Sequence, residues 1–342
     1  MSGQIQEAKS NQSKSKQGNI LLKYGTIIMV VVLALIFQGI SPMFLSMGNI
    51  MNILRSASIL LVLTLALSVV VSTSEFDLSF GMVASLASIV SAALMVWYGT
   101  PIWVAVSVPL VIGLLIGWIN GVLIEYLGIK DILATLGVSF VVQGIHLTIG
   151  QGNSIHNMMM NPWTKEKALG AIPDAFRFMA TGYIGPIPTL VIIAFSIAVL
   201  VHLFLYKSRW GRYIYVIGGN REAGFLAGIK VKQVQILAFM ICGMLAAFAG
   251  ILLTARIGSG QLYCGENYFM EALLATFLSF TVFGAGKANV PGAIVGAIFA
   301  TIISNGLTMA GIHPYSVDIY KGFALVFAVG FQSYQVMRAK KQ

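Results

Sequence analysis

Charged residues are scarce in this sequence: Asp, Glu, Lys and Arg make up 9% of its 342 residues, whereas hydrophobic residues make up 58%. Soluble domains carry roughly 25% charged residues, so this composition excludes an ordinary soluble domain and favours a polytopic membrane protein. Two cysteines, neither in a Cys-x-x-Cys pair, give neither a disulfide framework nor a thiolate metal site. The four histidines share no metal-ligand spacing, so we expect no metal and no other cofactor.

The sequence also lacks the motifs of nucleotide chemistry. The G-x-x-x-x-G-K-[ST] pattern is absent, because Gly286-Lys287 has neither the upstream glycine nor the following Ser or Thr. No Rossmann glycine pattern, nucleophile elbow or zinc motif is present either. We therefore expect no catalytic residues and no enzyme activity in this chain.

Ten apolar runs approach or reach the ~20 residues that a helix needs to cross a ~30 Å hydrocarbon layer. They cover residues 21–40, 54–73, 80–98, 102–125, 132–149, 189–206, 234–256, 271–286, 290–310 and 318–337. The predicted fold is all-α: a polytopic membrane domain over residues 21–337, between a disordered polar tail (1–20) and a short tail (338–342). The run 271–286 is short, which indicates a tilted or broken helix.

The positions of Lys and Arg predict how these helices are oriented. With ten spans and a cytoplasmic N-terminus, fifteen of the 21 Lys and Arg residues fall in cytoplasmic segments. Such a bias is typical of cytoplasmic loops, so we expect both termini in the cytoplasm. The net charge of +10 follows from this topology, and we expect contact with membrane lipid and none with nucleic acid.

One cytoplasmic loop, about 207–233, is longer than two neighbouring helices need. Its glycines Gly218 and Gly219 are predicted to form a turn with Asn220, which then caps a short helix that ends at Gly228. A helix of about two turns is unstable alone, so we expect it to dock against a partner. On the other side, about 151–188 is predicted to be an external cap with short interfacial helices, or a plain loop.

Small residues recur at helical spacing in two spans. They are Gly113, Gly117 and Gly121 in one span, and Gly292, Gly296 and Ala300 in the other. Each set lies on one helix face and allows another helix to approach closely. Tight packing is the expected role, and a face that slides during transport is the alternative.

Two carboxylates lie between the second and third spans, in the polar run 72–81. If the helix breaks within the membrane, its irregular backbone must line a polar cavity, and Asp77 and Ser79 are then candidates for a solute path. If the run is an ordinary turn, both carboxylates are solvated and Asp77 caps the third helix. Asn120, Gln143 and Asn305 lie inside apolar spans, where they either bond neighbouring helices or line the path of a polyhydroxyl solute.

Four motifs recur in one order along the chain: Phe76–Gly81, Asp131–Gly137, Gly218–Ile229, and Pro291–Ala297 followed by Ser304–Leu307. Together, over about residues 50–335, they resemble the membrane subunits of bacterial ABC importers for ribose and other simple sugars. The chain departs from the family pattern at Gly224, where Ala is usual, and at Ser74-Glu75, where two glycines are usual. Phe76 and Phe80 are also bulkier than the common Ile and Val.

The resemblance implies a permease domain whose 219–231 segment is a coupling helix. The implied coupling residues are Gly219, Asn220, Arg221, Glu222, Ala223 and Gly228. The implied partners are cytoplasmic ATP-binding subunits, a periplasmic or lipid-anchored solute-binding protein, and a second permease subunit, identical or paralogous. The implied location is the bacterial cytoplasmic (inner) membrane.

Other cargoes fit the same superfamily: a branched-chain amino acid, a nucleoside or a sugar-derived signal. A different class, an ion-coupled secondary transporter, would need an intramembrane proton relay, which usually shows paired carboxylates inside spans. Here Glu75 and Asp77 form the one close pair in the sequence, at a span junction. Solute flux by this chain alone, driven by an ion gradient, would distinguish the secondary transporter from the importer.

Overall fold

The computed structural model describes residues 27–280, 282 and 287–339, and nearly all of this chain is helical. An apolar helix, Ile27–Ile40, comes first. The other helices are α2 (Met47–Val71), α3 (Phe80–Tyr98), α4 (Ile102–Glu125), α5 (Asp131–Gly150), α6 (Asp174–Thr181), α7 (Thr189–Lys207), α8 (Arg209–Gly219), α9 (Arg221–Leu226), α10 (Val231–Ile257), the 3-10 turn η1 (Glu266–Tyr268), α11 (Phe269–Ser279), α12 (Val290–Met309) and α13 (Pro314–Ala339). Two residues each of β1 (Tyr183–Ile184) and β2 (Ile187–Pro188) pair antiparallel. The predicted all-α polytopic class is confirmed.

Each of the ten predicted spans coincides with a helix or part of one. In the described part of the chain, seven helices are long and apolar enough to cross a membrane: α2, α3, α4, α5, α7, α10 and α12. The described part of the first predicted span is the shorter helix Ile27–Ile40, and α11 has 11 residues. The tail 1–20 and parts of the spans 21–40 and 271–286 lie outside the described residues.

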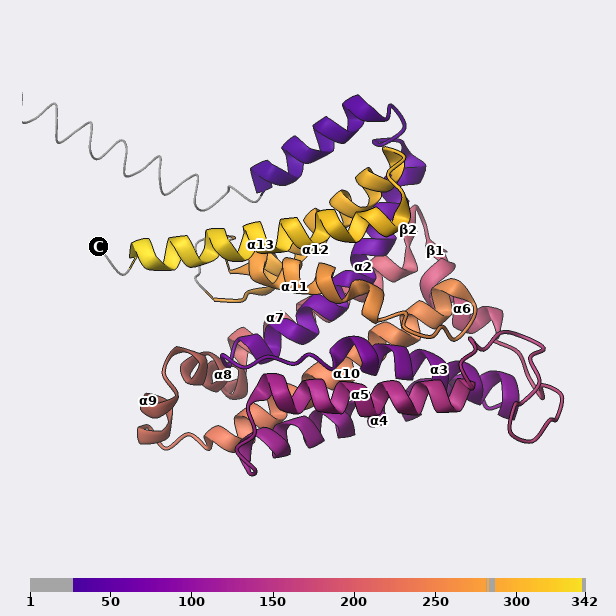
Figure 1. The fold of residues 1–342 in the computed structure, drawn as a ribbon, viewed down its shortest axis with the longest axis horizontal. Helices are drawn as coiled ribbons and strands as arrows, with labels where there is room; N and C mark the ends of the chain where they lie inside the picture. The colour runs from indigo at the N-terminus through magenta and orange to yellow at the C-terminus, as the bar shows by residue number, and fades with distance from the viewer. Residues whose placement is uncertain (1–26, 281, 283–286, 340–342) are drawn as a thin grey trace, which may run out of the picture.

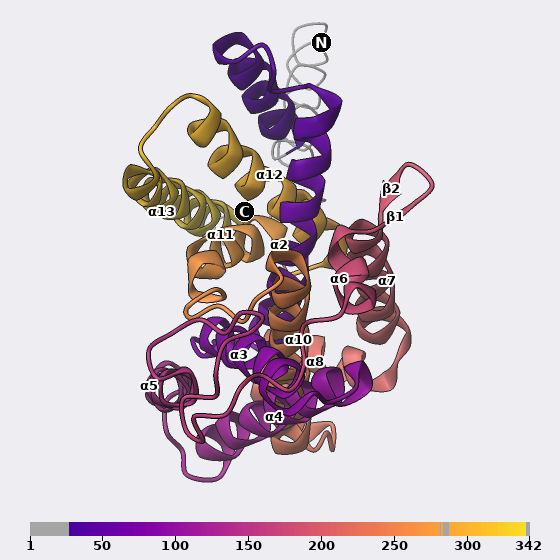
Figure 2. The ribbon, with the colours of Figure 1, turned by 90° about the vertical axis from the view of Figure 1, so that its right-hand side faces the viewer.

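Helix α10 lies at the centre of the bundle, packed against α2, α3 and α4. Figure 2 shows α3, α4, α5 and α10 gathered in one group, and α11, α12 and α13 in another. Helix α2 contacts both groups, through α10 on one side and through α11 and α12 on the other. Helix α3 is the most buried of the seven spans.

The glycine stripes lie where helices touch backbone to backbone. A side chain at Gly113 or Gly117 would clash with the α10 carbonyls of Gly243 and Phe239. On α12, the Cβ of a side chain at Gly292 would lie 2.5 Å from the carbonyl oxygen of Ser279 on α11. The prediction that these stripes allow close packing is confirmed, since any larger residue would push the helices apart.

The connection from α10 to α11, residues 258–268, does not stay at the surface. It lies along α3, where the Ser88 hydroxyl accepts a bond from the Gln261 amide (3.1 Å) and the Ser85 hydroxyl accepts one from the Gly265 amide (3.0 Å). Gly265 reaches the backbone of Gly81, in the first turn of α3. Non-helical backbone at this depth requires such partners, and it is tolerated where protein or a polar cavity surrounds it.

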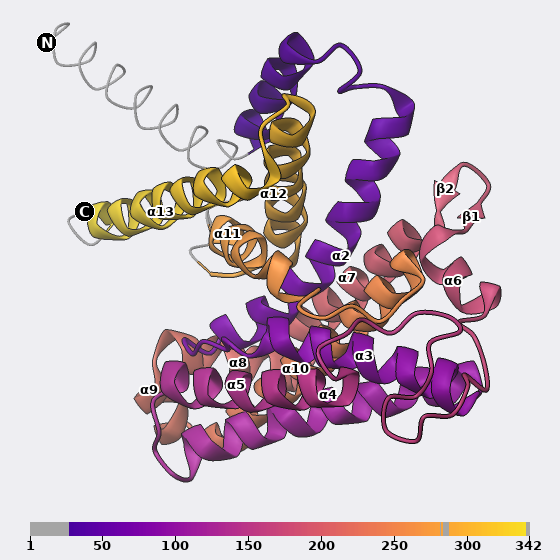
Figure 3. The same ribbon diagram turned by 45° about the vertical axis from the view of Figure 1, so that its right-hand side comes forward.

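The two ends of the molecule differ in structure. Helices α8 and α9 lie at one end, together with the C-terminal end of α13, whereas the 151–188 segment lies at the opposite end (Figures 1 and 3). That segment contains one short helix, α6, and the β1–β2 hairpin, which the sequence analysis did not predict. It is held to the bundle by a bridge between Ile155 and Gly260 and by a bond from the Gly170 amide to the Val96 carbonyl.

Candidate coupling loop and solute cavity

Helix α8 covers a part of the 207–233 loop for which the sequence analysis predicted no helix. Its hydroxyl cap, Ser208 Oγ, accepts a bond from the Gly211 amide (3.0 Å), and the helix continues through Gly218 and Gly219. The predicted turn over Gly218, Gly219 and Asn220 is therefore wrong, because Asn220 alone leaves the helical conformation. Gly218 instead allows α8 to lie close to the end of α2, because a side chain there would clash with the carbonyl oxygen of Ser72.

Helix α9 has the caps that the sequence predicts. Asn220 Oδ1 accepts a bond from the Ala223 amide (2.9 Å). Gly228 follows the helix with φ of +76°, and the Ile229 amide bonds back to the Gly224 carbonyl (3.1 Å). A left-handed residue at this place favours glycine, because a Cβ would be strained. The predicted short capped helix is confirmed.

Arg221 ties α9 to the bundle. Its guanidinium contacts both carboxylate oxygens of Glu125 at the end of α4 (3.1 and 2.8 Å), and Glu75 lies 3.4 Å away. Gln235 of α10 also donates to Glu75, at 3.0 Å. Burial, and then the nearby carboxylate of Asp131, raise the pKa of Glu75 to about 7, although Arg221 acts in the opposite direction.

Within the described part of the chain, no other segment covers the outer side of α9. Phe225 is 70% exposed and Leu226 is 80% exposed. Glu222, Ala223 and Gly228 are exposed beside them. An apolar pair at the tip of a short helix, at the end of the molecule rather than along its sides, is typical of a protein-binding surface.

Asp77 lies in the loop between α2 and α3 and is 1% exposed. Its Oδ1 atom accepts bonds from the Ser79 amide (2.8 Å) and hydroxyl (2.6 Å), and Asn120 on α4 donates to the same hydroxyl (2.9 Å). The expectation that a turn leaves Asp77 solvated is wrong. Asp77, Ser79 and Asn120 form a buried polar cluster, in which Asn120 Oδ1 has no bonding partner among the described residues. Their place in a solute path stays a prediction.

The 131–137 motif explains why this loop has a fixed shape. Asp131 Oδ2 accepts a bond from the Phe76 amide (2.7 Å), and Thr135 Oγ1 accepts one from the Leu78 amide (3.1 Å). The first two turns of α5 thus bind two backbone amides that no helix satisfies. Nothing in the sequence predicts that these two motifs meet, because the bonded residues are separated by 55 and 57 positions.

A polar cavity of about 610 Å³ lies between α2, α10, α11, α12, α13 and the 258–268 segment. It is lined by Ser56, Leu253, Ile257, Gln261, Leu262, Cys264, Asn267, Tyr268, Glu271, Thr301, Ser304, Asn305, Thr308 and Lys321. Of the five residues predicted for a solute path, it contains Asn305 alone. Gln143 lies on α5 and donates to the Tyr263 hydroxyl at 3.2 Å. The remaining three, Asp77, Ser79 and Asn120, belong to the buried polar cluster.

Glu271 is the charged centre of this cavity and is 8% exposed. Its Oε1 atom accepts a bond from the Ser304 hydroxyl (2.6 Å) and contacts the Lys321 ammonium (2.8 Å). Beside it, the side-chain amides of Asn305 and Asn49 exchange two bonds of 2.9 and 3.0 Å, which join α12 to α2. The sequence analysis missed Glu271 and Lys321, although an acid and a base inside predicted spans are a usable signal.

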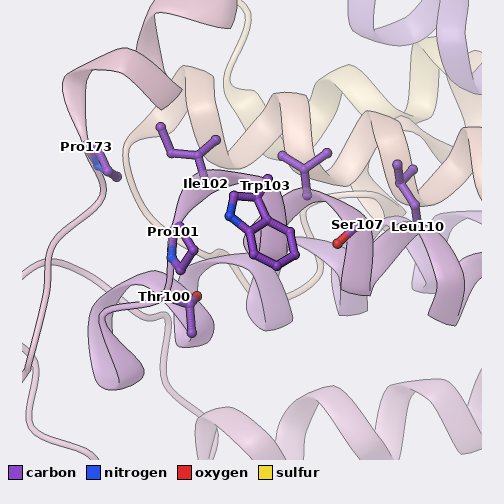
Figure 4. A pocket seen from close by; sticks show the side chains of 8 residues that line it. Thr100, Pro101, Ile102, Trp103, Ser107, Leu110 and Pro173 are labelled. Carbon is purple, nitrogen blue, oxygen red and sulfur yellow. The ribbon is translucent and has the colours of Figure 1, made fainter.

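A second, larger hollow of about 770 Å³ is apolar and lies at the start of α4 (Figure 4). Most of its lining comes from Thr100 to Leu110, with Pro173 at its edge. Trp103 is 72% exposed there. Aromatic side chains near the ends of spans contact the headgroup region, so this hollow faces lipid rather than a polar solute.

A family model described as the permease component of a branched-chain amino acid transport system matches residues 49–329. This chain belongs to that permease family. Ribose import permease protein RbsC of Haemophilus influenzae is 30% identical over 326 residues, which cover 95% of this chain and 98% of that protein. D-allose transport system permease protein AlsC of Escherichia coli is 29% identical over 325 residues, covering 94% and 95%. Galactose/methyl galactoside import permease protein MglC of Escherichia coli is 29% identical over 340 residues, covering 95% and 96%.

No solved structure matches the permease. Its resemblance to the membrane subunits of bacterial sugar importers, inferred from four motifs, is confirmed by these relatives. The family and the apolar helices together make the permease a multi-pass protein of the bacterial cytoplasmic membrane.

Proposed function

We propose that this permease is the transmembrane subunit of an ATP-driven importer and forms the translocation path for a simple sugar. The relatives named for ribose, allose and galactose support this cargo class. The observation that carries the proposal is the cavity beside Glu271, which is lined by hydroxyl and amide groups that suit a polyhydroxyl solute. A branched-chain amino acid is the second candidate cargo, because the matched family model is described by it.

The proposed topology has ten transmembrane helices with both termini in the cytoplasm. It is supported by the ten helices that coincide with the ten apolar runs. It is also supported by the position of the basic α8–α9 loop, which lies at the same end of the molecule as the C-terminal end of α13 (Figure 1). Cytoplasmic segments are enriched in Lys and Arg, so this end is the cytoplasmic one.

Helix α9 is the proposed coupling helix, and Gly219, Asn220, Arg221, Glu222, Ala223 and Gly228 are its proposed coupling residues. The exposed Phe225 and Leu226 provide an apolar surface for a groove on a cytoplasmic ATP-binding subunit. Arg221 then transmits force into the bundle, because its guanidinium is bonded to Glu125 on α4 and lies beside Glu75.

At the opposite end, the 151–188 segment is the proposed landing surface for a periplasmic or lipid-anchored solute-binding protein. A second permease subunit, either another copy of this chain or a paralogue, completes the transporter. Both partners are proposed on the basis of the importer assignment.

The test is uptake of D-ribose, D-allose and D-galactose into proteoliposomes that contain the permease with its ATP-binding and solute-binding partners. Uptake should require ATP and both partners. Uphill transport by the permease alone, driven by an ion gradient, would instead support a secondary transporter. Leucine uptake without sugar uptake would support the amino acid alternative.

Coupling is tested with Glu222→Arg and Leu226→Glu, which change the exposed side of α9 without breaking its contacts to the bundle. Both should leave the permease in the membrane while separating ATP hydrolysis from uptake. Arg209→Glu is the control, because Arg209 is exposed at the same end but lies on α8. Gly228→Trp should uncouple too, although the positive φ of Gly228 makes that variant strained. Normal uptake by Glu222→Arg and Leu226→Glu would contradict the docking role.

A further inference from the structure

We propose that the cavity beside Glu271 is the binding site of the transported solute, and that Glu271, Ser304 and Asn305 hold its hydroxyl groups. This inference rests on the proposed function and adds the residues and the chemistry of recognition. It differs from the expectation that the 72–81 run lines the path.

The first argument is the cost of an acid and a base within the bundle. Glu271 on α11 and Lys321 on α13 lie 2.8 Å apart, with side chains 10% and 13% exposed. Ionisable side chains in transmembrane segments are costly and usually mark solute or ion pathways. The pair also adjoins open space, because both residues line the cavity of about 610 Å³.

The second argument is the chemistry of the walls. Hydroxyl and amide groups come from Ser56, Gln261, Asn267, Thr301, Ser304, Asn305 and Thr308. The Thr301 hydroxyl is buried and has no bonding partner within the described part of the chain. Groups that both donate and accept match the hydroxyls of a sugar, which do the same.

The third argument is charge. The lining residues include one acid and one base, and these contact each other. Lys321 also lies 3.4 Å from Asp318, whose side chain is 78% exposed. Because the buried charges are paired, the cavity favours a neutral polyol. A zwitterionic amino acid would have to separate Glu271 from Lys321 before its own charges could bind. That separation is expensive in a partly buried pair. The cavity therefore favours a sugar over leucine.

The fourth argument is position. The cavity is bordered by the last turns of α10 and α12 and by Lys321 in the first half of α13. Those parts of the helices lie toward the end that carries the 151–188 segment, away from α9 (Figures 1 and 3). A solute released on the outer side would meet this cavity before the cytoplasmic half of the bundle.

The main experiment compares Asn305→Ala with Asn49→Ala in the reconstituted importer. Both variants break the same pair of amide bonds between α2 and α12. Asn305 lines the cavity and Asn49 does not. Asn305→Ala should raise the KM for D-ribose uptake severalfold, while Asn49→Ala leaves it unchanged. Equal effects would assign the pair a structural role and overturn the inference.

Glu271→Gln and Ser304→Ala extend the test. Loss of a charge-assisted bond to the solute should raise KM about tenfold for Glu271→Gln, and less for Ser304→Ala. With monodeoxy sugars, one analogue should bind wild type and variant equally, because the hydroxyl that the residue holds is missing. A variant that weakens every analogue by the same factor would contradict direct contact.

A labelling measurement gives a readout that does not depend on transport. In a background without Cys242 and Cys264, Thr308→Cys places a thiol at the mouth of the cavity, and Thr148→Cys places one on α5, outside it. D-ribose delivered by the solute-binding protein should slow maleimide labelling at position 308 and not at 148. If D-ribose did not change the labelling rate at position 308 in an importer that takes up the sugar, the inference would be overturned and the proposed function would stand. Absence of sugar uptake by the wild-type importer would instead overturn the proposed function.

Discussion

Asp77 and Glu271 are both carboxylates buried within the helical bundle, 1% and 8% exposed, but their surroundings differ. The bonds to Asp77 come from Ser79, two residues away, through its amide and its hydroxyl. The side-chain amide of Asn120 donates to that hydroxyl. Glu271 borders a cavity and is bonded by groups from two other helices, Ser304 of α12 and Lys321 of α13.

The comparison shows that burial of an acid does not by itself indicate a solute path. A carboxylate whose partners are near in sequence accepts hydrogen bonds from backbone amides that a local bend leaves unpaired. A carboxylate that needs partners from distant helices holds those helices together and, where space adjoins it, can exchange one partner for a solute. Asp77 belongs to the first kind and Glu271 to the second.

The largest effect on stability is expected from Asp77→Ala. It removes the acceptor of both Ser79 bonds and leaves a buried amide without a partner, at a cost of about 3 kcal/mol. The melting temperature in detergent should fall, and uptake should fall with the amount of folded protein. Glu271→Gln keeps the bond from Ser304 but loses the ion pair with Lys321. Its distinguishing effect should be a higher KM for sugar uptake by the protein that remains folded.

The control for that pair is Asp77→Asn, which keeps an acceptor and should lose less stability than Asp77→Ala. If Asp77→Ala kept its melting temperature while the KM for sugar rose, Asp77 would line the path after all. The distinction between the two carboxylates would then fail.

An intermediate effect is expected at Glu75, two residues from Asp77 and partly open to solvent at the Arg221 contact. Burial and Asp131 raise its pKa from 4.5 to about 7, so the folded state holds this proton more tightly than the unfolded chain. The stabilisation from Glu75 is complete below pH 4.5 and is lost as pH rises to about 7. Melting temperatures measured across this window should fall more for wild type than for Glu75→Gln. Parallel curves would show that Glu75 titrates normally.

The smallest effect is expected from Asp174→Ala. Its side chain is fully exposed, and its contact with Arg177 is 3.9 Å long in the first turn of α6. Ion pairs of this kind contribute little, so neither melting temperature nor sugar uptake should change. A loss of uptake with normal stability would place Asp174 in the surface that receives the solute-binding protein.

Several features could be predicted from sequence because their causes are local. Asn220 and Gly228 mark the two ends of α9, since a side-chain cap and a left-handed glycine act within one turn. The stripe at Gly113 and Gly117 predicted a close helix contact for the same reason. Gly218 misled the sequence analysis, because a glycine required for a turn and one required for close approach look identical in sequence.

The solute cavity could not be predicted in the same way. Residues 258–268 have no apolar periodicity, and their course along α3 depends on hydroxyls of Ser85 and Ser88 more than 170 residues earlier in the chain. Glu271 and Lys321 could each have been noted as charges inside spans. Their contact follows only from the packing of α11 against α13.

The amino-acid sequence by itself determined the all-helical membrane class, the expected sides of the loops and the family, because hydropathy, basic-residue bias and short motifs act locally along the chain. The tertiary structure alone decided which polar groups meet. Hydrogen bonds and ion pairs between helices depend on how those helices are arranged, and no spacing in the sequence records that arrangement.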